Sequence, residues 1–421
     1  MTSIQLLRLF HTIYYGRPPN IDFIQDLGLL AVKIGQTYAQ RADFLPDASC
    51  RELARLYRHT TPIAPEQIDQ LLRANTPKDW KDEFAEIDPH PLACASVGQV
   101  HRATLKSSEA VVVKVVRNSF SGTFERDVKK VRCLLSWLVR CYPKLARVAD
   151  PIGTLDHIRA STVNELNLRN EVAGQQTLRD LYERYRDHYD LAKLRFPRIY
   201  PKLSNQNVMV SEWLSGPTFD ELLTQDELRY ESLLDLFQIH GFFLFCTGTF
   251  HGDLHPGNVI LQNNDIFLLD TGAISQVDDS MRRGVFNFFD SVVSQNWSEA
   301  ADALYSMSRS KLRPSALDNF REAFKILYQP FLGKTVSELS LTKQMMQTIR
   351  LAVDHGMNFE TGMYPIIKSL MYLDGMALAC APNRDLMSDL KPFLDRFRPW
   401  VHDGIGESPI IEEQLDPALH G

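Results

Sequence analysis

The sequence lacks long hydrophobic runs and any signal for secretion. No stretch reaches the roughly 18 uninterrupted apolar residues that a membrane-spanning helix needs. The nearest candidates, residues 241–250 and 370–381, are too short or contain a charge. The N-terminal segment has too few basic side chains and no clear cleavage site for a signal peptide. These absences predict a cytoplasmic protein and leave peripheral contact with a membrane surface open.

Basic charge and clustered cysteines are also scarce. The 46 basic and 52 acidic residues give a net charge of −6, which argues against a nucleic-acid partner. The six cysteines show no CxxC spacing, so we expect reduced thiols. With 421 residues, 44% hydrophobic and 23% charged, the chain is typical of a soluble globular protein of two or three domain-sized units.

The pattern of helices and strands changes near residue 90. Before this point the chain is helical, with a Pro/Asp-rich link at residues 87–91, and after it valine-rich runs predict strands. The helices expected before the link are a short one ahead of Pro18-Pro19 and three more over residues 22–40, 48–57 and 65–74. The elements expected after it are strands over 96–105, 110–116 and 208–213, helices over 124–142 and 155–185, and mainly helix beyond 216, interrupted by 251–273.

The most informative motif is the segment 250–260, Phe-His-Gly-Asp-Leu-His-Pro-Gly-Asn-Val-Ile. Asp253 precedes Asn258 by five positions across a Pro-Gly turn, and Asp270 follows in an Asp-x-Gly sequence after an apolar strand. Asn258 and Asp270 offer oxygen ligands to Mg²⁺ beside nucleotide phosphates. Asp253 can orient or deprotonate an attacking hydroxyl or water, while His251 braces the loop. The alternative, an ordinary turn between two strands, is disfavoured because the spacing matches the kinase pattern.

A nucleotide also needs a cation, and Lys114 lies within the valine-rich strand 110–116. Strand alternation places Lys114 on the same face as Val112 and Val116. A buried lysine needs an anionic partner. We therefore expect Lys114 to meet the α and β phosphates and a helix carboxylate, with Glu171 the leading candidate.

A loop that covers the phosphates is expected ahead of Lys114, within residues 91–103. It contains only one glycine, Gly98, and therefore lacks the usual Gly-x-Gly-x-x-Gly pattern. From the residues alone, a plain β-hairpin is the better interpretation. The residues that we count toward a nucleotide site here are Ala93, Ala95, Ser96 and Val97, with Glu212 of the 208–213 strand.

The segment 29–41 is apolar except for Lys33, Gln36 and Gln40, which share one helix stripe at positions i, i+3 and i+7. The stripe is either a solvated edge or a buried face that meets polar partners. Periodicity leaves both interpretations open. Further along, helical spacing would place Asn167 and Glu171 on one face and Glu165 about 120° away, facing a different neighbour.

These segments resemble the UbiB/AarF family of atypical kinase-like proteins over roughly residues 22–273. The most specific match is Lys33-Ile34-Gly35-Gln36 with the family's K-x-G-Q signature. The remaining matches are Arg41, Asp43, Leu45 and Pro46; the alanine-rich loop 93–101; Lys114 and Glu171; the loop residues His251, Asp253, His255, Pro256, Gly257 and Asn258; and Asp270 with Gly272.

The resemblance implies an α+β, two-lobed protein-kinase-like fold. Its expected parts are an N-terminal helical extension over the active site at residues 1–90, a small β-rich lobe with a helical insert at 91–215, and a larger helical lobe at 216–421. In this family the K-x-G-Q lysine, here Lys33, faces the nucleotide pocket with Gln36 beside it and pairs with acids of an E-x-D motif. The family is associated with ATPase activity and with ubiquinone biosynthesis at membranes.

Several positions depart from the family pattern. The E-x-D motif is Glu165-Leu166-Asn167, so one expected acid near Lys33 is an amide. The other departures are Cys94 in the loop, Leu254 after Asp253, and Thr271 in Asp-x-Gly. The sequence also ends at Gly421 without the hydrophobic C-terminal anchor of many bacterial members, an observation that we take as evidence against stable membrane insertion.

We therefore expect an ATP-dependent phosphotransferase or ATPase that uses ATP (or ADP) and Mg²⁺. Its expected partners are a small-molecule or lipid-like pathway intermediate and biosynthetic enzymes.

Two features argue against a regulated protein kinase. Gly252 replaces the arginine of such kinases, and no Ala-Pro-Glu follows Asp270 within forty residues. Three alternatives stay open: a phosphotransferase of the aminoglycoside or choline kinase type, a nucleotide-binding scaffold of low turnover, and a lipid-binding surface on the C-terminal third. The Met-rich segment 363–376 in that third is more typical of a protein core than of a lipid-binding surface.

Overall fold

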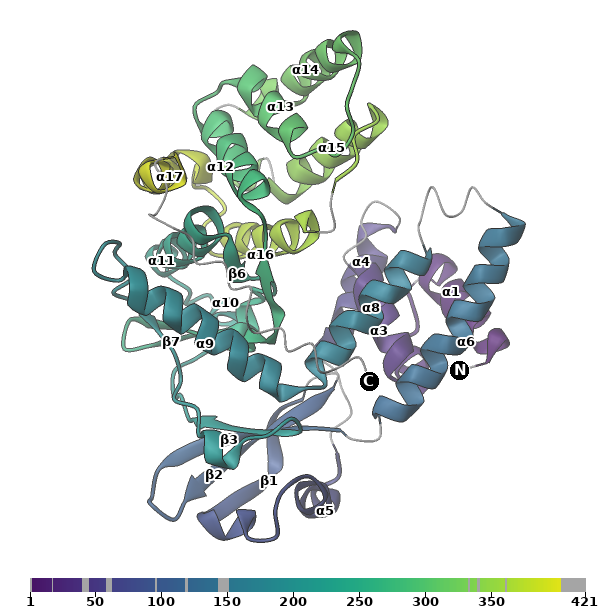
Figure 1. The fold of residues 1–421 in the computed structure, drawn as a ribbon, viewed down its shortest axis with the longest axis vertical. Helices are drawn as coiled ribbons and strands as arrows, with labels where there is room; N and C mark the ends of the chain where they lie inside the picture. The colour runs from purple at the N-terminus through teal and green to yellow at the C-terminus, as the bar shows by residue number, and fades with distance from the viewer. Residues whose placement is uncertain are drawn as a thin grey trace. The chain divides into compact units, whose positions relative to one another are not determined.

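The computed structural model describes residues 2–16, 18–39, 45–57, 63–94, 97–117, 120–142, 151–331, 334–338, 341–359 and 362–402. The chain forms two compact units, each described here by itself (Figure 1). Unit 1 comprises Met1–Arg179, Phe196–Ser215 and Leu269–Ala273, and unit 2 comprises Asp180–Arg195, Gly216–Leu268 and Ile274–Gly421.

Unit 1 contains an antiparallel sheet in the order β1-β2-β3-β5. Its strands are β1 (Phe84–Cys94), β2 (Gly98–Leu105), β3 (Ala110–Val116) and β5 (Val208–Glu212). Val111, Val113 and Val115 are fully buried on one face, against a cluster that includes α5 (Pro65–Asn75). Val116 points the other way and packs with Leu168. The predicted alternation along β3 is confirmed, and it leaves Lys114 on the Val116 face.

The predicted link at residues 87–91 is wrong, because these residues belong to β1. Among the described residues β1 is an edge strand that pairs only with β2, and its register shifts between Ile87 and Pro91 and again between Pro91 and Ala93. Proline lacks the N–H that a central strand would need, but an edge strand with bulges tolerates it. The Pro/Asp-rich composition therefore hid an irregular strand.

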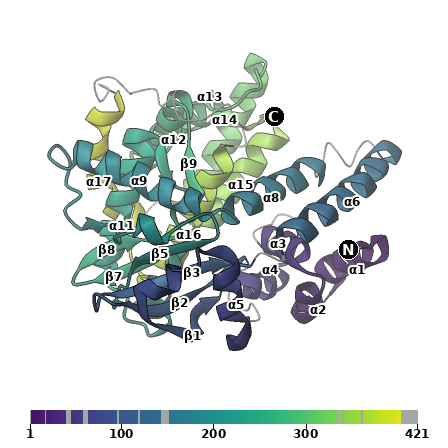
Figure 2. The same cartoon turned by 60° about the horizontal axis from the view of Figure 1, so that its bottom comes forward.

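The N-terminal helices of unit 1 share one hydrophobic core with the helical insert (Figures 1 and 2). Buried side chains such as Leu9, Ile34 and Leu53 belong to the same cluster as Phe124 and Ile158. The helices are α1 (Ser3–Tyr15), α2 (Ile21–Asp26), α3 (Leu29–Ala39), α4 (Asp47–Ala54) with a 3₁₀ turn at Arg55–Tyr57, α6 (Phe120–Cys141) and α8 (Pro151–Glu165).

Two long helices predicted from periodicity are each broken in the structure. The helix expected over residues 22–40 divides into α2 and α3 at Gly28, whose φ of +94° lies in the left-handed region that glycine favours. The helix expected over 155–185 divides into α8 and α9 (Leu168–Tyr185), and α9 continues into unit 2. Asn167 lies at this break and accepts a hydrogen bond from the Arg169 N–H. The predicted helical spacing of Asn167 and Glu171 is therefore wrong, because asparagine competes for backbone groups at a helix end.

Unit 2 is mainly helical and holds two small sheets. β4 (Leu194–Arg195), β8 (Asp265–Leu268) and β7 (Val259–Gln262) form one, and β6 (Thr249–His251) pairs with β9 (Ile274–Gln276). Its helices are α10 (Phe219–Thr224), α11 (Tyr230–Gly241) with a π-helical extension at Phe242–Thr247, α12 (Asp279–Val293), α13 (Trp297–Ser306), α14 (Pro314–Tyr328), α15 (Leu341–Asp354), α16 (Met363–Cys380) and α17 (Leu386–His402). Met363, Leu370 and Met376 are buried, so this segment of α16 contributes core side chains.

Candidate nucleotide and magnesium site

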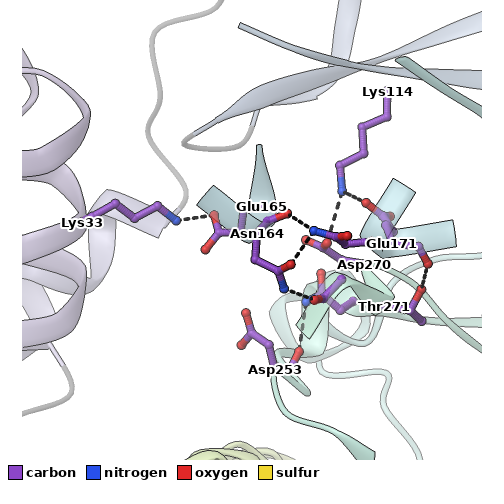
Figure 3. A network of polar contacts seen from close by, with 11 residues as sticks. Lys33, Lys114, Asn164, Glu165, Glu171, Asp253, Asp270 and Thr271 are labelled. Atoms are coloured by element: carbon purple, nitrogen blue, oxygen red, sulfur yellow. Dashed lines mark hydrogen bonds and ion pairs between the residues drawn. The ribbon is translucent and has the colours of Figure 1, made fainter. Parts of the chain in front are cut away.

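Lys114 lies between two carboxylates in unit 1 (Figure 3). Its Nζ donates hydrogen bonds to Glu171 Oε2 at 2.6 Å and to Asp270 Oδ1 at 3.2 Å. The side chains of Lys114 and Glu171 are 15% and 10% exposed, whereas that of Asp270 is 48% exposed. The predicted contact between Lys114 and Glu171 is confirmed. It arises because Leu168, one turn before Glu171, packs on the Lys114 face of the sheet.

The cluster combines one ammonium group, that of Lys114, with the two carboxyl groups of Glu171 and Asp270. Burial opposes the ammonium charge, but Asp270 and Glu171 outweigh it and hold the pKa of Lys114 above its ordinary value. Burial raises the pKa of Glu171 to about 7, with Lys114 acting in the opposite direction. Above that pH, one ammonium and two carboxylates carry a net negative charge. The half-exposed Asp270 carboxylate, a hard oxygen ligand, therefore fits a divalent cation such as Mg²⁺.

The Asp-x-Gly segment is held by α8 and α9. Asp270 has a φ of +51°, in the left-handed region that aspartate tolerates better than most residues. The hydroxyl of Thr271 donates to the Glu171 carbonyl at 2.7 Å, and Asn164 Nδ2 donates to the Gly272 carbonyl at 2.9 Å. Thr271, a departure from the family pattern, thus ties the Asp-x-Gly segment to the helix that carries Glu171.

Asn164 was missed by the sequence analysis. It comes from the last turn of α8, and Asn170 Nδ2 donates to its carbonyl at 3.1 Å. The available signal was weak: Asn164 directly precedes the Glu165-Leu166-Asn167 motif, but its partner Gly272 lies 108 residues away.

Two described residues of the Lys33 stripe are buried, which favours the second of the two interpretations that periodicity left open. Lys33 and Gln36 are 9% and 6% exposed. Lys33 forms an ion pair with Glu165 at the end of α8 (Figure 3). Gln36 Nε2 donates to the Leu56 carbonyl at 3.0 Å, so this amide has a structural partner within the helical region. Gln40 lies outside the described residues.

The residues of the loop 250–260 belong to unit 2. The Asp253 N–H donates to His251 Nδ1 at 3.2 Å, and Asn258 Nδ2 donates to the Asp253 carbonyl at 3.0 Å. His251 is 1% exposed and therefore braces the loop, as predicted. The Pro-Gly turn adopts one turn of 3₁₀ helix, Pro256–Asn258. Because the Asn258 nitrogen bonds the protein, its amide oxygen is the atom suited to a cation.

A lysine that the sequence analysis did not single out lies beside this loop. Lys368 Nζ, on α16 of unit 2, is 2.9 Å from Asp253 Oδ1. The two residues are 115 positions apart, and nothing in the spacing of α16 marks Lys368 as a partner of the loop.

The remaining predicted site residues lie around the sheet. Ala93 pairs with Val100 in the β1–β2 hairpin, and the Val97 carbonyl accepts from the Arg117 N–H at 2.9 Å. Gly98 is required by packing, since a Cβ there would lie 2.4 Å from the Val115 carbonyl oxygen. Ala95 and Ser96 lie outside the described residues. Glu212 ends β5, and its carboxylate accepts from the Arg198 N–H at 3.1 Å.

Two features are absent from the part of the chain that the structure describes. No helix among them is both long and apolar enough to cross a membrane. No group of three or more His, Cys, Asp or Glu side chains in the same part of the chain is arranged to hold a metal ion. Mg²⁺ sites that use substrate phosphates commonly need only one or two protein carboxylates.

Comparisons with known proteins place the chain in a family. Residues 55–304 match the family described as the ABC1 atypical kinase-like domain. "Probable protein kinase UbiB" of Vibrio vulnificus (strain YJ016) is 28% identical over 411 residues, covering 94% of this chain and 72% of the relative. The protein of the same name from Histophilus somni (strain 129Pt) is 28% identical over 405 residues, covering 91% and 71%.

A solved structure agrees at the level of the fold. Rv3197 from Mycobacterium tuberculosis, solved in complex with erythromycin, aligns with a TM-score of 0.57 at 18% identity, covering 95% of this chain and 92% of that one. The fold is α+β and kinase-like, with a small antiparallel sheet and a mainly helical remainder. The chain belongs to the ABC1 family of atypical kinase-like proteins, which is the UbiB/AarF family that its motifs resemble.

Proposed function

We propose that this protein is an ATP-dependent, Mg²⁺-requiring enzyme that hydrolyses ATP or transfers its γ-phosphoryl group to a small molecule. The observation that carries the proposal is the Lys114 ammonium, bonded at once to buried Glu171 and half-exposed Asp270. A nucleotide site needs a fixed cation for the phosphates and a nearby carboxylate for the metal, and this cluster offers both.

Each residue has a distinct proposed role. Lys114 binds the α and β phosphates, and Glu171 orients the Lys114 side chain. Asp270 and Asn258 hold Mg²⁺, which neutralises charge on the β and γ phosphates when bound. Asp253 accepts the proton of the attacking water or hydroxyl as the new O–P bond forms. The bond between the γ-phosphorus and the β,γ-bridging oxygen breaks at the same time, and ADP leaves with that electron pair.

We further propose a role in isoprenoid quinone or lipid biosynthesis, performed at the membrane periphery in the cytoplasm. The support is membership of the ABC1 family together with the resemblance to UbiB/AarF proteins. Lys33 adds to it, because the K-x-G-Q lysine is buried and paired with Glu165, the first acid of the E-x-D motif.

The test is ATP hydrolysis by the purified full chain, with and without Mg²⁺, anionic vesicles and candidate phenolic or isoprenoid compounds. We expect Mg²⁺-dependent hydrolysis that vesicles or such compounds stimulate. Hydrolysis that is absent, or equal in wild type and Asp253→Asn, would contradict the enzymatic role and favour a scaffold.

A small-molecule phosphotransferase is the second candidate, favoured by the segment His-Gly-Asp-Leu-His-Pro-Gly-Asn, which is equally typical of aminoglycoside and choline kinases. Transfer of labelled γ-phosphate to a hydroxylated compound in a ligand screen would support it. Release of inorganic phosphate alone would support an ATPase.

A further inference from the structure

The loop that carries Asp253 has no strong cation of its own. Residues 250–260 include two histidines but neither lysine nor arginine. The structure supplies a cation from α16, where Lys368 Nζ lies 2.9 Å from Asp253 Oδ1. The side chains of Lys368 and Asp253 are 23% and 30% exposed, so the two charges meet partly out of water.

Lys368 is unusual within its helix. It is one of two charged residues in the 18 residues of α16, and the other is Asp374. A mostly buried ammonium on an apolar helix costs free energy unless it is paired. Its pairing with Asp253 therefore accounts for a lysine that the helix itself does not require.

α16 is fixed in register beside this lysine. Ser369 is fully buried, and its Oγ donates to the Ile366 carbonyl at 2.9 Å. His240 Nε2, on α11, lies 3.0 Å from the same Oγ. Because the serine proton is used for Ile366, the imidazole must donate. Burial lowers the pKa of His240 to about 3, which keeps the ring neutral with one N–H. Asp374 adds a second anchor by accepting two backbone N–H groups at the start of α15.

A second side chain of α16 meets the same loop. Tyr372, four residues after Lys368, contacts the His255 ring edge-on, with centroids 5.3 Å apart. Lys368 Nζ also lies 5.9 Å from the Tyr372 ring centroid. One face of α16 thus presents two residues, one turn apart, to Asp253 and His255 of the loop.

The loop fixes the backbone of Asp253 but not its carboxylate. The N–H and the carbonyl of Asp253 are held by His251 and Asn258. The carboxylate oxygen nearest Lys368 makes a charge contact rather than an aligned hydrogen bond. The direction of the carboxylate therefore depends on the ammonium of Lys368, while its lone pairs can still accept a proton.

We propose that Lys368 is the positioning residue for Asp253. Its ammonium fixes the orientation of the Asp253 carboxylate. In that orientation the carboxylate can accept the proton of the attacking water or hydroxyl. Lys368 neither gains nor loses a proton in the step. This inference rests on the proposed function, because it assigns a second residue to the proton acceptor of that reaction.

The test is steady-state ATP hydrolysis by the full chain with Lys368→Met, Lys368→Arg, Asp253→Asn and the double variant Asp253→Asn/Lys368→Met. The matched control is Lys334→Met, which removes a surface ion pair of similar length in unit 2, with Lys334 Nζ 3.0 Å from Glu338 Oε1. We expect Lys368→Met to lower kcat by about 10-fold to 100-fold, less than the roughly 10²-fold to 10⁴-fold that a proton-transferring group itself contributes, and to leave the KM for ATP within about twofold. Lys368→Arg should restore most of kcat, and Lys334→Met should match wild type.

The double variant separates positioning from structure. If Lys368 acts through Asp253, adding Lys368→Met to Asp253→Asn should change kcat by less than about twofold. Full additivity, or a wild-type kcat in Lys368→Met, would overturn the inference while the proposed function stands. Equal losses in the Met and Arg variants with a lowered Tm would likewise overturn it, in favour of a packing role. Absence of Mg²⁺-dependent hydrolysis in wild type would overturn both proposals.

Discussion

The two units hold their key lysines in different surroundings. In unit 1, Lys114 is 15% exposed and bonded to two carboxylates, so negative charge is in excess around it. In unit 2, Lys368 is 23% exposed and its Nζ lies 2.9 Å from Oδ1 of Asp253. An excess of negative charge suits a cluster that receives a metal ion, whereas a lysine set against a proposed proton acceptor suits a carboxylate whose orientation must be fixed. A lysine beside an aspartate therefore has no fixed role, because its surroundings decide whether it serves a metal site or orients a carboxylate.

Removing Asp270, the carboxylate of unit 1 that we propose as a metal ligand, should have the largest effect. Asp270→Ala deletes the half-exposed ligand and leaves Lys114 paired with Glu171 alone. We expect Mg²⁺-dependent turnover to fall by about 100-fold or more, as for loss of a major charge-stabilising group. The rate of ATP hydrolysis as a function of Mg²⁺ concentration measures this fall in turnover. Asp265→Ala, which removes a carboxylate of β8 paired with Arg195 of β4, is the control and should behave as wild type.

Glu171→Gln should have a smaller effect, because Lys114 would keep its contact with Asp270. The variant replaces a charged acceptor by a neutral one of the same size. A hydrogen bond to a charged group contributes about 1.5–3 kcal/mol, and the neutral bond that glutamine can keep contributes about 0.5–1.5 kcal/mol. The difference is about 1–1.5 kcal/mol, so we expect kcat/KM for ATP to fall about tenfold. An unchanged kcat/KM would show that Glu171 does not orient Lys114.

Lys33→Ala tests whether the helical region of unit 1 acts on the nucleotide. We expect an altered ATP hydrolysis rate or nucleotide preference without unfolding. The partner Glu165 is 40% exposed and can be solvated when Lys33 is removed, so Tm should fall by only about 2–4 °C. Lys81→Ala, which breaks the surface pair with Asp69, is the matched control. An unfolded Lys33→Ala variant, or a folded one with wild-type kinetics, would show that Lys33 has a purely structural role.

His240 should affect the pH dependence of stability in unit 2 more than activity at neutral pH. Burial, with His251 nearby, lowers the pKa of His240 from 6.5 to about 3. Between these values the unfolded chain binds a proton that the folded chain does not. The free energy of unfolding should therefore fall as the pH falls, by up to about 1.4 kcal/mol per pH unit from this residue.

Denaturant unfolding at several pH values measures this contribution. His240→Gln should give a shallower loss of stability below pH 6.5 than wild type. Identical slopes in the two proteins would mean that His240 titrates normally and that the proposed anchor of α16 is absent.

The sequence predicts site residues best where they lie close together along the chain. The spacing of Val112, Lys114 and Val116 is that of one face of a strand. Asp253 and Asn258 lie within one loop. Both segments could therefore be recognised directly from the sequence. The ion pair of Lys114 with Glu171 was expected because a buried lysine needs an anionic partner, and the family resemblance implies the same pair. The pairing of Lys33 with an acid of the E-x-D motif was expected from the resemblance alone. Whether each residue acts as proposed on a nucleotide stays a prediction.

The sequence predicts poorly where the fold overrides local propensity. β1 was taken for a link because its prolines disfavour a central strand, yet an edge strand accepts them. The breaks at Gly28 and Asn167 were hidden by helical periodicity that continues on both sides. Lys368 and Asn164 could not be identified, since each meets its partner only through tertiary packing.

The most direct test of the central claim is the binding of Mn²⁺·ATP, with Mn²⁺ replacing Mg²⁺ and its free concentration followed by electron paramagnetic resonance. The account predicts that wild type binds the complex and that Asp270→Ala and Asn258→Ala each weaken binding by at least about tenfold, while Asp265→Ala does not. Equal affinity in wild type and both site variants would contradict it, because Asp270 and Asn258 would then not share one metal ion with the nucleotide.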